Sequence, residues 1–255
     1  MKMKGKVLLG SQTAKAGFKN ERDVINRFND WRKDGLAQSW LEIMDYNLKD
    51  IEFVKAVKVI GHYKADVQVQ IQITIKLKGE IDCENLSVKL VSNPQGFNQI
   101  DKRWIKKYVE LWKIDPETER VLKHFTGELP PYIKNTRDKR RMFATELLPK
   151  DLDRVLSFLK KNKVLIIADV LKGRGKFSAE WLLVIVKSRT AKVKLLWSLR
   201  PINEVLNFYN GEVGITKKGS FAIGKITMQR KGGDNGRASA NMLQFKINPA
   251  LLIKK

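Results

Sequence analysis

The stretch "KADVQVQIQITIK", residues 64–76, alternates apolar and polar side chains. From residue 67 onward, valines and isoleucines take the odd positions, and glutamine, threonine and lysine take the even ones. This period of two predicts a strand with one buried face. A second alternating stretch, "NLSVKLVS" at residues 85–92, follows a Lys78-Gly79 turn signal. Together the two stretches predict an antiparallel hairpin.

The register of this hairpin decides which polar side chains meet. A turn centred on residues 77–78 places Asp66 opposite Lys89, with Cβ atoms about 5 Å apart. A turn centred one residue later opposes Asp66 to Val91 and leaves Lys89 diagonal to it. Ser87 shares the face of Lys89, because successive side chains of a strand point to opposite sides. Both registers therefore bring a carboxylate, a hydroxyl and an ammonium group together.

Such a group of side chains suits hydrolysis of a phosphodiester. That reaction needs a divalent cation, an activated water and stabilisation of the developing charge. Asp66 offers a hard oxygen ligand for magnesium, the main-chain carbonyl of Val88 offers another, and Lys89 can orient or deprotonate the water. The alternative is a cross-strand Asp–Lys pair on the surface, which contributes little.

Composition favours a polyanionic partner. The chain has 255 residues, 50 Lys and Arg against 27 Asp and Glu, and a net charge of +23, which indicates nucleic acid rather than a membrane surface. The longest apolar runs have the length of strands, and no signal peptide is visible, so we expect a cytoplasmic protein without membrane contact. A single cysteine, Cys83, excludes an internal disulfide and a multi-cysteine zinc site. His62 and His124 lack metal-motif spacing and are expected to be structural.

Periodicity along the chain predicts a mixed α/β fold with an antiparallel component. The Pro-containing connection at 126–143 is the best candidate for an internal boundary. The predicted helices cover residues 11–35, the start of 37–61, 99–114, 148–162 and 202–209. Further strands are predicted at the end of 37–61, in a hairpin over 164–187, and at 191–200, 219–231 and 243–247.

Two other segments carry groups able to contact DNA bases. The first, "QRKGGDNGRASANMLQFK" at 229–246, has charged and amide side chains around three glycines, and these can bond to base edges in the major groove: Arg230, Lys231, Asp234, Asn235 and Arg237. Its alternative is a flexible polar hairpin tip. The second follows Lys89 and presents Phe97 beside Asn98 and Gln99. There the phenylalanine either wedges between bases or anchors the loop to the core.

Several blocks of this sequence are similar to the HinP/MspI group of type II restriction endonucleases, most closely to its HinP-type members, which cut GCGC. The blocks are "GSQTAKAGFKNE", "SVKLVSNPQGFNQIDKRW", "HFTGELPPY", "NTRDKRRMF" and "QRKGGDNGRASANMLQFK". They span nearly the whole chain. The resemblance implies the PD-(D/E)XK fold, a mixed sheet flanked by helices, and cleavage of double-stranded DNA that depends on Mg2+.

The resemblance also implies roles for residues of the hairpin. Asp66 takes the position of the metal-ligand aspartate, and Lys89 takes that of the motif lysine. Ser87 stands where the group has an uncharged amide and the wider superfamily has Asp or Glu, and Ala65 replaces the superfamily's proline. Because serine is a weaker ligand than a carboxylate, Glu21 is our candidate for a second metal ligand. Its alternative is a carboxylate on a helix surface.

For DNA contacts, the resemblance assigns Phe97 to intercalation, and Gln99 with the 230–237 loop to reading of the site. The first helix, near Lys15, would approach the minor groove. A CG-centred site contains a pyrimidine–purine step, which deforms readily. The basic run at 139–141 offers phosphate contacts or a solvated face.

These inferences predict a type II restriction endonuclease that recognises a four-base-pair, CG-containing palindrome, with GCGC expected. One endonuclease domain would span residues 1–255, with 1–125 carrying the catalytic hairpin and 145–255 a β-rich, DNA-reading part. A cognate DNA methyltransferase would be a functional partner. A palindromic site is compatible with a homodimer or with a monomer that nicks each strand in turn. The alternatives are a DNA-binding protein with a degraded site, marked by Ser87, and a nuclease selective for DNA structure.

Overall fold

The computed structural model describes residues 21–59, 68–75, 80–186, 195–233 and 237–253. The chain folds into two compact units, each built from segments that are distant in sequence. We name the first the hairpin unit; its described residues lie in 21–96, 172–205 and 249–253. The second is the antiparallel unit, with described residues in 97–171 and 206–248. That residues 1–125 carry the catalytic hairpin and residues 145–255 a DNA-reading part stays a prediction.

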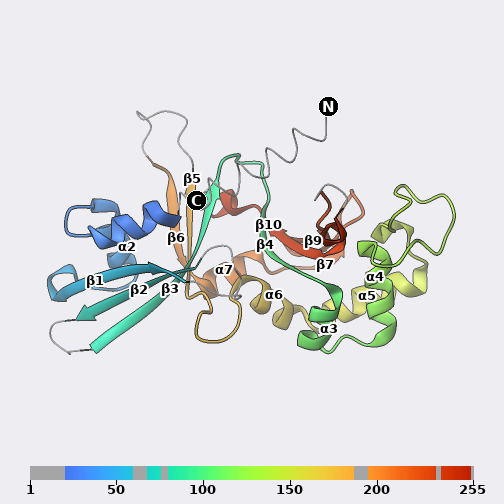
Figure 1. The fold of residues 1–255 in the computed structure, drawn as a ribbon, viewed down its shortest axis with the longest axis horizontal. Helices are drawn as coiled ribbons and strands as arrows, with labels where there is room; N and C mark the ends of the chain where they lie inside the picture. Colours follow the sequence, from blue (N-terminus) through green and yellow to red (C-terminus); the bar gives the residue numbers. More distant parts are fainter. Residues whose placement is uncertain (1–20, 60–67, 76–79, 187–194, 234–236, 254–255) are drawn as a thin grey trace. The chain divides into compact units, whose positions relative to one another are not determined.

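The hairpin unit contains a mixed five-stranded sheet of order β1-β2-β3-β5-β6 (Figure 1). β3 and β5 run parallel, and the other neighbouring strands run antiparallel. The bounds are β1 (Ile51–Lys58), β2 (Gln68–Ile75), β3 (Glu80–Val91), β5 (Trp181–Val186) and β6 (Trp197–Pro201). A central parallel pair explains the nearly continuous apolar run of β5, because such strands are buried on both faces.

The predicted hairpin forms, with the first of the two registers. Gln68 lies opposite Ser87 and Ile75 lies opposite Glu80, which is the pairing of a turn centred on residues 77–78. Asp66 itself lies outside the described residues. β3 extends further toward the turn than the stretch at 85–92 suggested, and its far end pairs only with β5 among the described strands.

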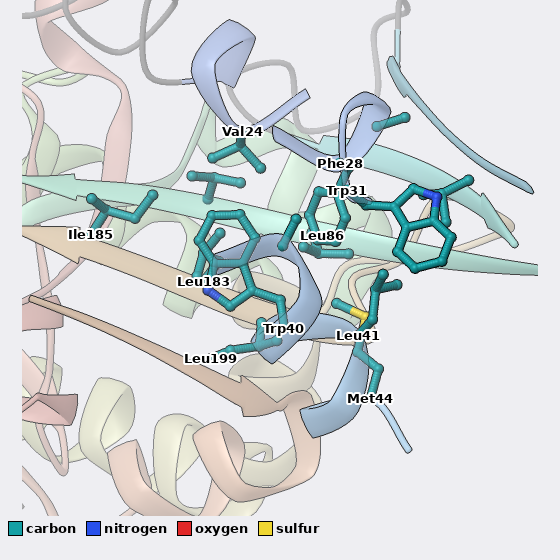
Figure 2. Packing of buried hydrophobic residues seen from close by; sticks show 14 of the residues in the cluster. Val24, Phe28, Trp31, Trp40, Leu41, Met44, Leu86, Leu183, Ile185 and Leu199 are labelled. Atoms are coloured by element: carbon teal, nitrogen blue, oxygen red, sulfur yellow. The ribbon is translucent and has the colours of Figure 1, made fainter. Parts of the chain in front are cut away.

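Helices cover this sheet through a compact apolar cluster (Figure 2). Residues 21–29 are helical and contribute Val24 and Phe28, while α2 (Gly35–Ile43) contributes Trp40, whose ring centroid lies 5.2 Å from that of Phe28. Leu86 of β3 and Leu183 of β5 meet these rings and are fully buried. The 3-10 turn η1 (Leu48–Asp50) then leads into β1. This agrees with the prediction of a helix at the start of 37–61 and a strand at its end.

The antiparallel unit contains a second five-stranded sheet, of order β4-β10-β9-β8-β7. Its strands are β4 (Asn98–Arg103), β7 (Val213–Ile215), β8 (Phe221–Ile223), β9 (Ile226–Arg230) and β10 (Leu243–Ile247). Its helices are α3 (Ile105–Trp112), α4 (Pro116–Thr126), α5 (Pro149–Lys161) and α6 (Lys163–Leu171), and the chain passes between the units within α7 (Ile202–Tyr209). The 3-10 turns are η2 (Ala144–Glu146), η4 (Ala238–Asn241) and η5 (Pro249–Leu252), the last in the hairpin unit.

Two predicted elements of this part of the chain are wrong. Residues 164–171 form helix α6 rather than the first strand of a hairpin. An apolar run without polar alternation fits a buried helix as well as a strand, and Ile166, Ile167 and Val170 are buried at helical spacing. Residues 99–103 form strand β4 rather than the start of a helix, because they pair with β10. The predicted fold class, mixed α and β with sheets flanked by helices, is confirmed.

None of the helices within the described ranges is long and apolar enough to cross a membrane.

Candidate nuclease site

β3 presents two different faces. Leu86 and Val88 are buried in the apolar cluster, at 0% and 1% exposure. Ser87 and Lys89, on the opposite face, are half-buried. They lie beside Leu182 and Val184 of the parallel strand β5. β3 is the middle strand of five. Ser87 lies in the ladders with both β2 and β5, and Lys89 lies in the ladder with β5.

The main chain of β3 also orients the carbonyl of Val88. Glu180 donates its N–H to the carbonyl of Asn85 at 2.8 Å, so Asn85, Ser87 and Lys89 direct their backbone polar groups toward β5. Alternation along a strand then directs the carbonyl of Val88 to the β2 side. The described part of β2 begins at Gln68, opposite Ser87, so this carbonyl lies past the described ladder.

Asn85 is a polar residue of this face that sequence reasoning missed. Its side chain is 7% exposed, and its amide nitrogen donates to the carbonyl of Lys176 at 3.0 Å. Its Oδ1 atom has no hydrogen-bond partner among the residues that the structure describes. The signal available in the sequence was alternation, which places Asn85 on the face of Ser87 and Lys89.

Glu21 lies on the buried side of its helix, at 3% exposure, which excludes a carboxylate on the helix surface. One of its oxygens lies 2.8 Å from the ammonium nitrogen of Lys58 on β1. A buried carboxylate needs such a partner, because its desolvation is costly. The proposed role of Glu21 as a metal ligand stays a prediction.

The metal-ligand set cannot be assembled from the described residues alone. Within them, no group of three or more His, Cys, Asp and Glu side chains is arranged to hold a metal ion. Asp66, the main expected ligand, lies outside that part of the chain. Of the histidines, His124 has Nδ1 2.6 Å from the carbonyl of Pro130 and its ring against Tyr132, as expected for a structural residue.

The expected DNA-contacting residues fall on two segments of the antiparallel unit. Phe97 is 51% exposed, so among the described residues it does not act as a buried anchor for its loop. Asn98 and Gln99 begin β4, and Gln99 lies opposite Lys246 of β10. Lys246 is half-buried, and burial lowers its pKa. Lys15 lies outside the described residues.

The second segment follows β9. Arg230 is the last residue of that strand, and its guanidinium donates to Oδ1 of Asn241 from Nε at 3.1 Å and from Nη2 at 2.7 Å. Lys231 continues the pairing through its N–H, and Gly232 and Gly233 both have a φ of 66°, which suits a turn. Arg237 precedes η4, while Asp234 and Asn235 lie outside the described residues.

Comparison with known proteins identifies the family. The model of the R.HinP1I restriction endonuclease family matches residues 44–253. This chain belongs to that family. Among solved structures, it is similar to the restriction endonuclease MspI in complex with its cognate DNA, with 14% identity and a TM-score of 0.62 over 89% of this chain and 87% of that one. No curated protein gives a significant match.

Membership in the R.HinP1I family confirms the expected class of enzyme: a type II, site-specific endonuclease that binds DNA. The likeness to MspI confirms the PD-(D/E)XK fold, a mixed sheet flanked by helices. The sheet of the hairpin unit is mixed in this way. The roles of individual site residues stay predictions.

Proposed function

We propose that this member of the R.HinP1I family is a magnesium-dependent endonuclease that cuts duplex DNA at GCGC. The proposal for the site of hydrolysis rests on the register of β2 and β3. The described ladder reaches Gln68 opposite Ser87, and Asp66 precedes Gln68 by two residues in the sequence. The same register favours Asp66 and Lys89 as the pair that acts on the phosphodiester.

The donor set on these strands suits magnesium, which prefers oxygen ligands and retains several waters. Asp66 would supply a carboxylate and Val88 its carbonyl, with Glu21 as the candidate for a further ligand. When bound, the cation neutralises charge on the phosphate and lowers the pKa of a bound water. Lys89 would orient or deprotonate the attacking water, and Ser87 would hold that water by a hydrogen bond.

Recognition is proposed to lie with the antiparallel unit. Phe97 is exposed beside Asn98 and Gln99, as an intercalating residue must be. Lys231, Asp234, Asn235 and Arg237 are proposed to read base edges, with Lys15 near the minor groove. Arg230, which the sequence placed in the same group, bonds to Asn241 and is not proposed as a base contact. We further propose a cytoplasmic enzyme that works with a DNA methyltransferase of the same specificity, and a homodimer on its palindromic site.

Digestion of a mapped plasmid tests this function. With magnesium, the enzyme should produce the discrete fragments expected for GCGC, and prior methylation by a GCGC-specific methyltransferase should prevent their formation. Chelation of the metal should also stop cleavage. Fragments that map to another sequence would overturn the proposed site, and a smear or intact plasmid with both magnesium and manganese would overturn the proposed activity.

A further inference from the structure

Four arginines of the antiparallel unit act on one another electrostatically. Three come from the connection between α4 and α5, namely Arg137, Arg140 and Arg141, and the fourth is Arg230 at the end of β9. We name this set the arginine cluster. Arg141 is affected by the charges of Arg230 and Arg137, and Arg230 is affected by that of Arg140. Arg230 follows Arg141 by 89 positions in the sequence, so only the tertiary fold brings it near the basic run at 139–141.

The backbone around the arginine cluster is fixed. Gly127 ends α4 with a φ of 87°, and a Cβ atom at this position would lie 2.7 Å from the carbonyl oxygen of Arg140, so the connection packs directly on the helix end. Asn241 joins the two parts of the cluster. Its amide nitrogen donates to the carbonyl of Gly127 at 2.8 Å, and its Oδ1 accepts both bonds from Arg230. Arg230 is therefore held in place rather than extended from the loop.

Phe143 holds two members of the cluster. The Cζ atoms of Arg137 and Arg141 each lie 3.9 Å from the centre of its ring. Two guanidinium groups cannot share one face of a ring at this distance, so they stack on opposite faces. Cation–π contacts of this kind orient a guanidinium plane while leaving its N–H groups available for an anion.

The positive charges of the cluster exceed its negative charges. Asp138 pairs with Arg140 through two bonds of 2.8 and 3.0 Å, and Glu146 lies 3.5 Å from Arg137. Two carboxylates thus face four guanidinium groups. The excess falls on Arg141, which lies 3.8 Å from Asp138, and on Arg230, which bonds to a neutral amide.

The charged form of Arg141 is disfavoured by its burial and by its positively charged neighbours. Its side chain is 14% exposed, and its Nε atom has no hydrogen-bond partner within the described part of the chain. Burial, followed by the charge of Arg230, lowers the pKa of Arg141 to about 10. Burial and the charge of Arg140 lower the pKa of Arg230 as well. An anion that bonds to both groups would relieve this repulsion.

We infer that the arginine cluster binds a backbone phosphate of the DNA substrate. The inference rests on the DNA-binding function of the family and adds a site that contacts no base. Guanidinium groups match phosphate oxygens in pairs, and phosphate contacts fix a protein's position along the duplex without reading its sequence. Because Arg230 directly precedes the segment 231–237, a phosphate held here would set where that segment meets the bases.

The test measures binding to a duplex that lacks GCGC, without a divalent metal, over a range of salt concentrations. Arg141→Gln should reduce the slope of log K against log salt by about 0.9, which corresponds to roughly tenfold weaker binding at 0.1 M salt. The loss should be equal on a GCGC duplex. Arg140→Gln, at a side chain that is 71% exposed, should act in the same direction without disturbing the fold.

Matched variants separate a phosphate site from general charge. Arg154→Gln removes the same charge from α5, where Arg154 faces Asp115 at 3.4 Å, and should leave the slope unchanged. Arg141→Lys keeps the charge but loses the planar fork, so it should keep the slope while weakening binding. Unchanged slopes for both Arg141→Gln and Arg140→Gln would overturn the inference, as would a loss confined to the GCGC duplex.

Inorganic phosphate distinguishes a DNA contact from a site for a free anion. At constant ionic strength, exchange of chloride for phosphate should raise the melting temperature of the wild type more than that of Arg141→Gln. A phosphate effect with unchanged DNA slopes would indicate a free-anion site and would also overturn the inference. Failure of the wild type to cut GCGC would leave these slopes interpretable, because they are measured on DNA without that site.

Discussion

The two sheets of this enzyme contain five strands each but present polar groups differently. In the hairpin unit, Lys89 projects from the middle strand, and the parallel neighbour β5 is apolar along its whole length. In the antiparallel unit, the candidate DNA contacts lie where strands begin or end, at Asn98 and Arg230. Groups that act on a reacting atom are positioned more precisely on a rigid strand, whereas binding residues are often carried by loops and strand ends.

The largest expected effect is a loss of cleavage without a loss of DNA binding. It tests whether the hairpin unit carries the chemistry while the antiparallel unit carries the binding. Lys89→Ala should lower the single-turnover cleavage rate on the order of 10²- to 10⁴-fold, because the group that handles the proton of the attacking water is removed. Affinity for GCGC duplex should remain close to wild type. Lys55→Ala, at an exposed lysine of β1, is the control and should cleave normally. Wild-type cleavage by Lys89→Ala would remove Lys89 from the reaction.

Core truncations test whether the two units are energetically distinct. Phe245 is fully buried and packs edge-on against Tyr108 and Trp112, so Phe245→Ala should lower the unfolding free energy of the antiparallel unit by about 3–5 kcal/mol. Leu183→Ala should lower that of the hairpin unit by about 2–5 kcal/mol. Hydrogen exchange followed by mass spectrometry would locate each loss.

Exposed apolar residues provide the matched controls for these truncations. Phe53→Ala in the hairpin unit and Val164→Ala in the antiparallel unit, at 49% and 74% exposure, should each change stability by less than about 0.5 kcal/mol. If each core variant increases exchange equally in both units, the chain unfolds as one cooperative body.

Helix caps give a smaller effect that can be compared across the units. Asp34 accepts N–H bonds from Leu36 and Ala37 at the start of α2, and Asp115 accepts that of Thr118 at the start of α4. Replacement of either aspartate by alanine should cost about 1 kcal/mol in urea unfolding at pH 7. Asn in place of Asp should restore most of this loss, since its side chain can also accept the bond.

The cap of α4 should also depend on pH. Burial raises the pKa of Asp115, but the bonds from Thr118 outweigh it and lower the pKa below its ordinary value. A lowered pKa means that the stabilisation is present above the ordinary carboxyl pKa of about 3.9 and is lost as the pH falls further. The stability difference between wild type and Asp115→Ala should therefore shrink toward about pH 2. A constant difference would contradict this account.

Glu84 of the hairpin unit should show the opposite, and smallest, pH effect. Burial raises its pKa despite bonds from Tyr46 at 2.8 Å and Trp181 at 2.7 Å. The folded state then binds the proton more tightly, so stability falls as the pH rises above the ordinary carboxyl pKa of about 4.3. Glu84→Gln should remove this fall, and Glu42→Gln, at an exposed position on α2, should keep it. Equal pH profiles for wild type and Glu84→Gln would contradict the prediction.

Prediction from sequence succeeded where neighbours along the chain carry the information. Alternation from residue 67 to 75 was sufficient for β2, and the helix predicted over 148–162 is α5. The run at 164–171 was misassigned because it is apolar except for Asp169, and such a run fits a buried helix as well as a strand. Asp169 is buried in the structure and pairs with Arg103. β4 was misassigned because its partner β10 lies about 140 residues later in the sequence.

The sequence by itself determined that β2 and β3 form a hairpin in one of two registers, because the turn and the alternation of side chains are local properties of one short segment. The pairing of Gln68 with Ser87 in the structure selected the register. Net charge and the blocks similar to the HinP/MspI group also pointed to a DNA endonuclease. Only the tertiary structure decided that Ser87 lies beside Leu182 and that Arg230 joins Arg141. Contacts between such distant positions depend on how whole elements pack, and no local period of the chain encodes them.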